Sequence, residues 1–280
     1  MAAVQRRGNS RQSASHYKKG ALGIKMGAPW FQIRHMEAPH GLVGLSANFP
    51  LYGDISNRLM SLVAGLGHRT EVYSIDEAFV DVEGIPGDLT ERSFKIRARI
   101  QCWLGLQCGV GIGSTKTLAK LANHVSKDAE RKPGSYPAHL AQVCNYEALS
   151  DQEKREILKS TLVGDIWGVG RRLGAQLAEV GVITALDLAQ MDPVVVRRKW
   201  SVVLERTVRE LNGQSCIALE DIPTEKKQIA VTRSFGAPVT EIEGLLAAVS
   251  EFAARGSFMC LPIPPLSGHP LSFHGRWWFP

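Results

Sequence analysis

Two adjacent acidic residues, Asp76 and Glu77, are the part of the sequence best suited to metal chemistry. They lie between two short β-like segments, residues 71–75 and 78–82. Neighbouring side chains of a strand point to opposite faces, but a bend between two strands lets both reach one ion. Paired carboxylates are a common means of holding Mg²⁺ beside a phosphate, so this acid pair is a candidate metal site. The alternative is a surface Asp-Glu pair in an ordinary hairpin.

A glycine-rich segment that leads into a basic helix, residues 109–127, offers candidate phosphate contacts. It is not a P-loop, because Thr115 rather than glycine precedes Lys116, and it is not a dinucleotide fingerprint, because Ser114 replaces the third glycine. With about 100° per residue, a helix here has one apolar and one basic face. The apolar face contains Leu118, Leu121, Ala122 and Val125, and the basic face Lys116, Lys120 and Lys127. The lysines either bind an anion or form a solvated face.

A third motif, residues 166–181, has the glycine spacing of a DNA-binding helical hairpin. Gly168 and Gly170 enclose a valine, and Arg171 and Arg172 follow directly. In such hairpins, backbone N–H groups at a helix N-terminus bind phosphate without reading the bases. The alternative is a glycine-capped hairpin that serves only packing.

Periodic apolar residues predict the elements that position these motifs. Strands are expected at 42–48, 71–75, 78–82 and 107–112, and helices at 51–66, 89–104 and 114–126. This order predicts an α+β fold rather than a doubly wound parallel sheet. After Asp151 the chain becomes helical, and a strand over 228–235 and a helix over 240–254 follow.

The composition limits the class of protein. Of 280 residues, 44% are hydrophobic, which excludes a disordered chain, and the net charge of +6 permits a nucleic-acid partner. The five cysteines form no C-x-x-C pair, which argues against a zinc site or a disulfide framework and fits a reducing cytoplasm. No apolar run approaches the roughly 18 residues of a membrane helix, and the first residues lack the apolar stretch of a secretory signal.

The motifs together resemble those of Y-family DNA polymerases of the UmuC type. Residues 73–81, YSIDEAFVD, resemble the family string S-I-D-E-A-[FY]-x-D, and residues 109–127 resemble its G-V-G-I-x-x-T-K-T-L-A-K-L-A-N-H-x-x-K. Residues 21–31 and 46–58 resemble its fingers segment and its S-x-N-x-x-x-Y-x-D-x-S-x-R run. The resemblance extends from about Ala21 to Arg255, with the motifs in order.

The resemblance implies a right-hand polymerase of the α+β class, with a ferredoxin-like palm, small fingers, a helical thumb with a helix-hairpin-helix and a partial little finger. It implies error-prone nucleotidyl transfer past damaged DNA in an SOS-type response, with two Mg²⁺ ions, a UmuD-like subunit and a sliding clamp. By the same resemblance, Asp76 and Glu77 are catalytic metal ligands and Lys127 binds the nucleoside triphosphate. Gly168, Gly170, Arg171 and Arg172 are the expected DNA contacts.

The expected domains follow from the same likeness. They are an unmatched basic arm (1–20), a fingers remnant (21–67), a palm (68–160), a thumb (161–222), the start of a little finger (223–255) and an unmatched Pro-rich tail (256–280). The tail stands where family members carry the region that binds partners, so we expect the clamp contact to be lost.

The beginning of the chain departs from the family pattern. In the family the first palm strand is central and carries a third metal-binding Asp, but this sequence has no Asp before Asp54. Residues 1–20 are rich in Arg, Ser, Gln and Gly, a composition that disfavours a strand. We therefore expect impaired catalysis. Two other hypotheses are a non-catalytic DNA-binding fragment and a decayed gene product that does not fold.

Overall fold

The computed structural model describes residues 2–6, 23–24, 28–45, 48–220, 231, 235 and 239–260, with the backbone alone for 2–6 and 258–260. The chain divides into two units, Met1–Asp221 and Ile222–Pro280. The second unit contains α12 (Ile242–Cys260), which confirms the helix predicted over 240–254 and extends beyond the predicted domain boundary at Arg255. The strand predicted over 228–235 falls mostly outside the described residues, as does most of the predicted tail.

A five-stranded sheet in the order β2-β3-β1-β4-β5 forms the centre of the first unit. Its strands are β1 (Ala2–Arg6), β2 (Arg69–Ser74), β3 (Glu77–Asp81), β4 (Cys108–Ile112) and β5 (Val143–Asn145). Neighbouring strands are antiparallel except for β4 and β5, which are parallel. The sheet with its helices confirms the predicted α+β class.

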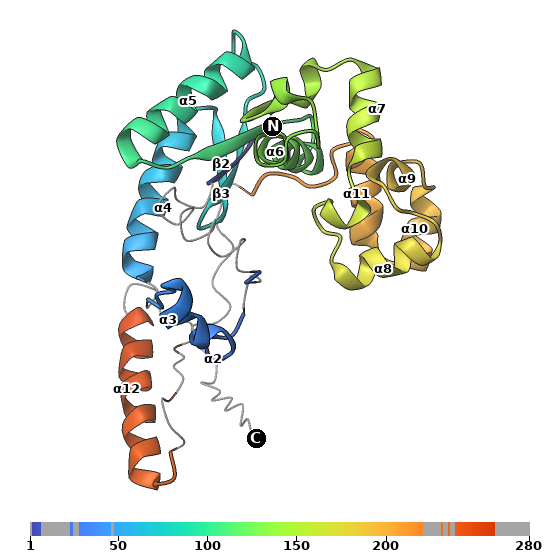
Figure 1. Ribbon diagram of the computed structural model, residues 1–280. Helices are drawn as coiled ribbons and strands as arrows, with labels where there is room; N and C mark the ends of the chain where they lie inside the picture. Colours follow the sequence, from blue (N-terminus) through green and yellow to red (C-terminus); the bar gives the residue numbers. More distant parts are fainter. Residues whose placement is uncertain are drawn as a thin grey trace. The chain divides into compact units, whose positions relative to one another are not determined.

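Helices pack against both faces of this sheet (Figure 1). On one face, α4 (Phe49–Ala64) and α5 (Leu89–Leu104) bury an apolar core that includes Leu59, Ile100 and Val80. On the other face lies α6 (Lys116–Arg131), whose residues Leu118 and Val125 are buried as predicted. The predicted helices 51–66, 89–104 and 114–126 are thus confirmed, because each has one apolar stripe that the sheet covers.

Close packing of α6 against β4 explains why residues 109–113 are rich in glycine, so these glycines do not require a phosphate loop. A Cβ atom added to Gly111 would lie 2.1 Å from the backbone nitrogen of Asn123 and 2.3 Å from the carbonyl oxygen of Ala119. Added at Gly113, it would lie 2.7 Å from the backbone nitrogen of Ala119. These alternate glycines lie on the strand face toward α6, so the helix backbone rests directly on the strand.

The strand β1 corrects the expectation that residues 1–20 supply no palm strand. Ala2 to Gln5 pair with Val80 to Glu77 of β3, and Ala2 to Arg6 pair with β4. The expectation rested on the average composition of twenty residues, which obscures the short Ala-Ala-Val run at their start. In addition, the facing edges of β3 and β4 carry backbone N–H and C=O groups that need hydrogen-bond partners, and a strand between them supplies these partners. The absence of an Asp in this strand is unchanged.

The segment between β1 and α4 contains short helices: α2 (Trp30–Ile33), η1 (Arg34–Met36) and α3 (Glu37–His40). The strand predicted over 42–48 is wrong for residues 42–45 and 48, which belong to no helix or strand. Val43 and Leu45 are strongly exposed, so no sheet face covers the apolar residues on which that prediction rested.

A helical region follows the sheet, as predicted after Asp151. It contains α7 (Asp151–Ser160), η4 (Val163–Asp165), α8 (Arg171–Glu179), α9 (Ala185–Ala189), α10 (Pro193–Lys199) and α11 (Val202–Leu211). Two further 3₁₀ turns, η2 (Ala138–Leu140) and η3 (Tyr146–Ala148), lie near β5. The apolar side chains of these helices form one core with the buried face of α6.

A buried carboxylate, Glu210 of α11, joins the helical region to the sheet region. Its Oε2 accepts hydrogen bonds from the Thr117 backbone N–H at 2.9 Å and from the Thr117 hydroxyl at 2.7 Å. Its Oε1 accepts from the backbone N–H groups of Cys216 at 3.1 Å and Ile217 at 2.9 Å. The Thr115 hydroxyl donates to the Glu210 carbonyl oxygen at 3.0 Å. The side chain therefore holds α11, the start of α6 and the segment after α11 together.

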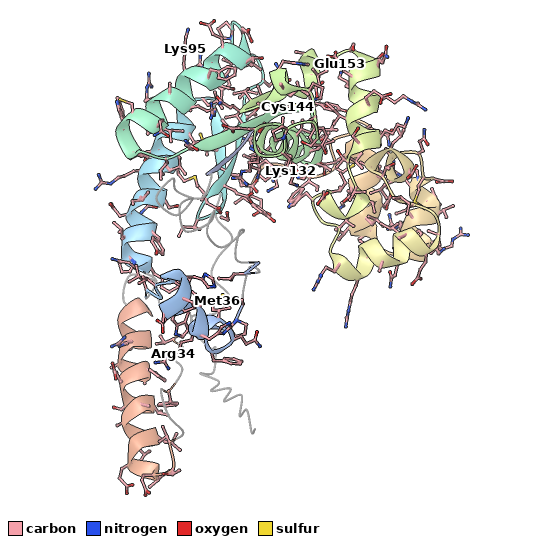
Figure 2. The ribbon with its side chains drawn as sticks, in the orientation of Figure 1. Arg34, Met36, Lys95, Lys132, Cys144 and Glu153 are labelled. Carbon is pink, nitrogen blue, oxygen red and sulfur yellow. The ribbon has the colours of Figure 1, made fainter. Side chains whose placement is uncertain are left out.

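Four of the five cysteines have described side chains. Cys102, Cys108, Cys144 and Cys216 are free thiols. Cys144 lies among packed side chains (Figure 2), where burial raises the pKa of its thiol to about 12. Among the described residues, no helix has the length and apolar character needed to cross a membrane.

Candidate functional site

The acid pair lies at the turn between β2 and β3. Asp76 is in the turn and Glu77 is the first residue of β3, and both are half-buried. The Ser74 hydroxyl donates to Asp76 Oδ1 at 2.9 Å and fixes that carboxylate. In the backbone register, Gln5 of β1 lies opposite Glu77. The turn thus presents two carboxylates at one end of the sheet.

The lysines of α6 contact acidic residues of β2 and β3. Lys116 is buried and its ammonium lies 2.5 Å from Glu71 Oε2. Lys120 lies 2.7 Å from Glu77 Oε1. The alternative of a solvated basic face is therefore wrong for these two residues, because α6 rests on the sheet and its lysines reach acidic residues more than 40 positions earlier in the chain.

A pocket of about 240 Å³ lies beside the acid pair and brings two predicted site residues together. Its lining includes Glu77 and Lys127, and the other lining residues are Lys120, Asn123, His124, Asp165 and Trp167. Of the predicted metal ligands, only Glu77 lines this pocket. We call this hollow the acid-pair pocket.

Electrostatics make Lys127 responsive to an anion in this pocket. Burial, together with the positive charge of Lys120, lowers the pKa of Lys127 to about 8, and the charges of Glu77 and Asp76 oppose the shift. Burial also lowers the pKa of His124, so its imidazole is neutral at pH 7. An anion in the pocket would favour the charged form of Lys127.

Three aromatic residues that were not singled out from the sequence form a cluster at this place, and one of them, Trp167, lines the acid-pair pocket. The Trp167 indole N–H donates to the Tyr73 hydroxyl at 3.2 Å, and the rings of Tyr73, Phe79 and Trp167 lie 5.6–5.7 Å apart. The ammonium of Lys120 lies 5.6 Å from the centre of the Tyr73 ring. Trp167 is next to a predicted DNA contact, but its partner lies 94 residues away, so no local pattern signals this cluster.

The predicted DNA-binding hairpin forms around the start of α8. Gly168 has a φ of +89°, a backbone conformation that favours glycine, and Gly170 is the residue before the first turn of α8. Both glycines and both arginines, Arg171 and Arg172, are exposed. The first helix of the motif is only the 3₁₀ turn η4. The exposed N-terminus of α8 leaves backbone N–H groups that can donate hydrogen bonds to an anion.

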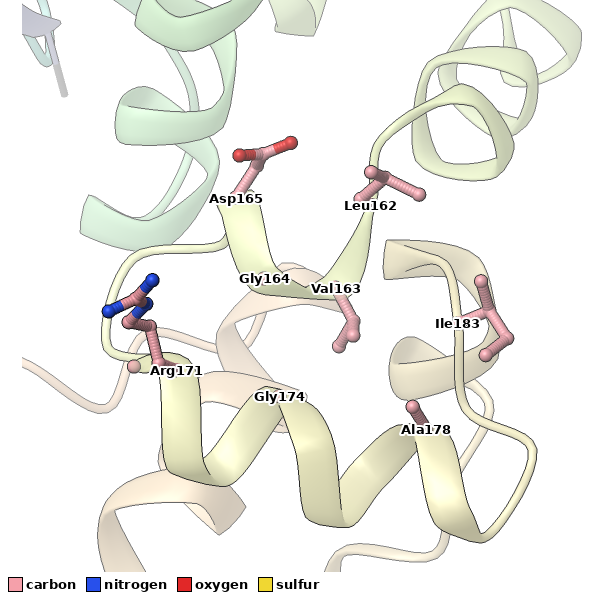
Figure 3. Close-up of a pocket in the computed structure, with 9 residues that line it drawn as sticks. Leu162, Val163, Gly164, Asp165, Arg171, Gly174, Ala178 and Ile183 are labelled. Atoms are coloured by element: carbon pink, nitrogen blue, oxygen red, sulfur yellow. The ribbon is translucent and has the colours of Figure 1, made fainter. Parts of the chain in front are cut away.

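A second pocket, of about 400 Å³, lies between η4, α8 and the segment at Ile183 (Figure 3). Most of its lining is apolar, including Leu162, Val163 and Ile183, and Figure 3 shows Asp165 and Arg171 at one side of it. Gly174 lies in α8 opposite Gly164, and a Cβ atom added to Gly174 would lie 3.8 Å from the Gly164 Cα. This is an ordinary van der Waals distance, so the packing at Gly174 accepts a small side chain and does not require glycine.

The acid pair fits one divalent cation better than two. Asp76 and Glu77 are adjacent hard-oxygen donors of the type that Mg²⁺ prefers, and none of the hydrogen bonds among the described residues uses Asp76 Oδ2 or Glu77 Oε2. No group of three or more His, Cys, Asp or Glu side chains suited to a metal occurs within the described part of the chain. A cation at this pair would complete its coordination with water or phosphate oxygens.

Solved structures with the same fold identify the class of protein. The chain superimposes on the structure titled "Insertion ternary complex of Dbh DNA polymerase" with a TM-score of 0.60 and 20% identity, over 79% of this chain and 70% of that one. DinB from Sulfolobus solfataricus gives a TM-score of 0.59 and 21% identity, over 79% of this chain and 70% of that one. The fold is that of the Y-family DNA polymerases.

Sequence comparison identifies the branch of that class. The model of the impB/mucB/samB family matches residues 1–124, and so includes β1, where we expected the likeness to begin near Ala21. Protein SamB of Salmonella typhimurium is 44% identical over 239 residues, and protein UmuC of the same species 41% over 238, each covering 84% of this chain. The chain belongs to the UmuC type of Y-family polymerases. It spans about half the length of these relatives, 54% of each.

Proposed function

We propose that this chain derives from, and retains the core of, an error-prone translesion DNA polymerase that transfers nucleotides onto a primer opposite damaged template bases. The observation that supports this most is the acid-pair pocket, where Glu77 and Lys127 line one hollow beside Asp76. A carboxylate pair beside a lysine is the arrangement that phosphoryl transfer requires. The domain boundaries expected for palm, fingers, thumb and little finger belong to the same proposal, with β1 added to the palm.

In this proposal Asp76 and Glu77 hold Mg²⁺, and Lys127 binds the triphosphate. When bound, Mg²⁺ lowers the pKa of the primer hydroxyl and offsets the charge of the phosphates. Ser74 orients the Asp76 carboxylate through its 2.9 Å hydrogen bond. The Trp167 ring lines the pocket, and its indole N–H donates to the Tyr73 hydroxyl at 3.2 Å. Template-directed incorporation of one nucleotide tests the proposal, and incorporation that ignores the template or survives Asp76→Asn would contradict it.

The affinity of the pocket for a nucleoside triphosphate should fall as the pH rises through about 8, the pKa of Lys127. A lysine with a lowered pKa binds an anion well while protonated and loses this attraction above its pKa. We expect the affinity for a non-hydrolysable dNTP analogue, measured in EDTA by titration calorimetry, to weaken about tenfold between pH 7.5 and 9.5. Lys127→Arg stays charged and should remove the pH dependence, apart from any titration of the analogue. An equal decrease in this variant would contradict the role of Lys127.

A second candidate function is DNA binding without catalysis through the helical hairpin. The exposed Gly168, Gly170, Arg171 and Arg172 at the N-terminus of α8 support it. The contacts would be to phosphate, so the binding would have no sequence preference. This function needs neither the acid pair nor a metal, and a missing carboxylate would not affect it.

Replacing Arg171 and Arg172 by alanine should weaken binding to all DNA sequences alike and flatten its salt dependence. Each phosphate contact contributes about −0.9 to the slope of log K against log salt, so the slope should change by about 1.8 if each arginine neutralises one phosphate. Fluorescence anisotropy of labelled primer-template over a salt series measures both quantities. The matched control is Arg155→Ala with Lys159→Ala on α7, two exposed cations of equal charge. An unchanged slope in the arginine variant, or equal losses in both variants, would rule out the hairpin as the contact.

The wider setting also belongs to the proposal. From the resemblance of the motifs we propose an SOS-type role with damaged DNA and deoxynucleoside triphosphates in a cytoplasmic, reducing compartment. A UmuD-like subunit and a sliding clamp are the partners expected for the full-length protein. Because the chain spans only about half of its relatives, copurification of this chain with each partner would show which contacts these 280 residues carry.

A further inference from the structure

We infer that Lys120 sets the divalent-cation affinity of the acid pair, because its ammonium occupies the Glu77 carboxylate and must leave it before a cation binds fully. The inference rests on the proposed role of Asp76 and Glu77 as metal ligands. In addition to that role, it assigns to Lys120 the control of cation access to these two carboxylates.

The contact between Lys120 and Glu77 is short and shielded. Lys120 Nζ lies 2.7 Å from Glu77 Oε1, and the two side chains are only 18% and 13% exposed. Exposed pairs such as Lys95 with Glu91 are 71% and 64% exposed, and such pairs contribute little. A shielded pair interacts more strongly, because water screens it less. A cation approaching Glu77 therefore meets both competition for one oxygen and repulsion by the ammonium.

The position of Lys120 is fixed by its helix. The apolar face of α6 is buried, with Leu121 and Ala122 next to Lys120 at 3% and 0% exposure, so the helix cannot withdraw the lysine by shifting. The Tyr73 ring, whose centre lies 5.6 Å from the ammonium, adds a cation–π contact that helps to hold the ammonium at this place. Only a rotation of the side chain itself releases Glu77.

The surroundings allow that rotation for Lys120 but not for its neighbour. Lys116 is 2% exposed, and the Glu71 Oε2 atom that it contacts also accepts a hydrogen bond from the Glu220 backbone N–H at 2.7 Å. The Lys116 side chain therefore has no room to rotate away from Glu71. Lys120 instead borders the acid-pair pocket, whose lining includes a second carboxylate, Asp165. A cation at Glu77 would displace the ammonium into the pocket, toward Asp165 or toward a bound phosphate. Cation and anion binding would then strengthen each other.

Binding of Mn²⁺ alone, measured by electron paramagnetic resonance on the full chain, tests the inference. Lys120→Met removes the competitor, and we expect it to raise the Mn²⁺ affinity at least about tenfold. Lys120→Arg keeps the charge and the pairing and should leave the affinity near that of the unmodified chain. Lys132→Met, at the C-cap of the same helix and paired with Asp128, is the matched control for loss of one positive charge and should show no gain. Adding Glu77→Gln to Lys120→Met should abolish the gain.

The outcomes separate this inference from the function on which it rests. If the chain binds Mn²⁺ at Asp76 and Glu77 but Lys120→Met binds it no more tightly, the inference is wrong and the metal role stands. An equal gain in Lys132→Met would also overturn it, because the effect would then be one of net charge. If no variant binds Mn²⁺, the metal role itself fails. Lys120→Gln serves as a second uncharged variant should the methionine variant unfold.

Discussion

Replacing Glu210 by glutamine should lower the free energy of unfolding of the first unit by about 3–5 kcal/mol. The carboxylate is fully buried and accepts four hydrogen bonds, two at each oxygen, all from the protein. Glutamine has the same shape but only one acceptor oxygen, so its amide NH₂ would face two donors. Each buried donor left without a partner costs about 1–3 kcal/mol, and donor–donor repulsion adds to this.

Urea unfolding followed by tryptophan fluorescence measures this change. The matched control is Glu205→Gln on the same helix, because Glu205 pairs with Arg197 and Arg209, whose guanidinium groups reach solvent. Solvated partners are easily rehydrated, so the control should lose less stability than Glu210→Gln, although Glu205 is itself 8% exposed. A Glu210→Gln variant as stable as this control would show that Glu210 does not join α11 to α6.

Introducing a carboxylate into β1 should raise primer extension by at least about 10² over the chain as it stands. Two adjacent carboxylates suit one divalent cation, and the family resemblance implies a third on this strand. Gln5 lies opposite Glu77 in the backbone register, and Arg6 is the next residue toward the turn that holds Asp76. Directly opposite residues of an antiparallel pair have Cβ atoms about 5 Å apart, within reach of a shared cation.

The measurement is extension of a labelled primer in Mg²⁺ and in Mn²⁺ by the chain, Gln5→Asp and Arg6→Asp. Gln5→Asn and Arg6→Asn are the matched controls, because they make the same change in size without adding a carboxylate. Asp76→Asn in the more active variant should abolish the gain. Comparable extension by the chain and both Asp variants would contradict the need for a third carboxylate. No extension by any of them would leave DNA binding through the hairpin as the supported function.

Local patterns in the sequence were enough to predict the regular elements around the site. The helix 89–104 was predicted with its observed ends. Its apolar residues recur at helical spacing because they form the face that packs against the sheet. The acid pair between two strands and the glycine hairpin before α8 were also visible locally, since turns need particular residues at fixed spacing. Motif likeness alone indicated the family.

Only the tertiary structure decided how these parts meet. The lysines of α6 formed one basic face in the sequence, but sheet register placed Lys116 on Glu71 and Lys120 on Glu77, which turned a surface pattern into partly buried ion pairs. No local pattern singled out Glu210, because its four hydrogen-bond donors come from residues as far as 93 positions away. The residues that follow β1 in the sequence disfavour a strand. Strand β1 forms nevertheless, because it pairs with β3 on one side and with β4 on the other. Pairings across tens of residues depend on packing and register, which local composition does not encode.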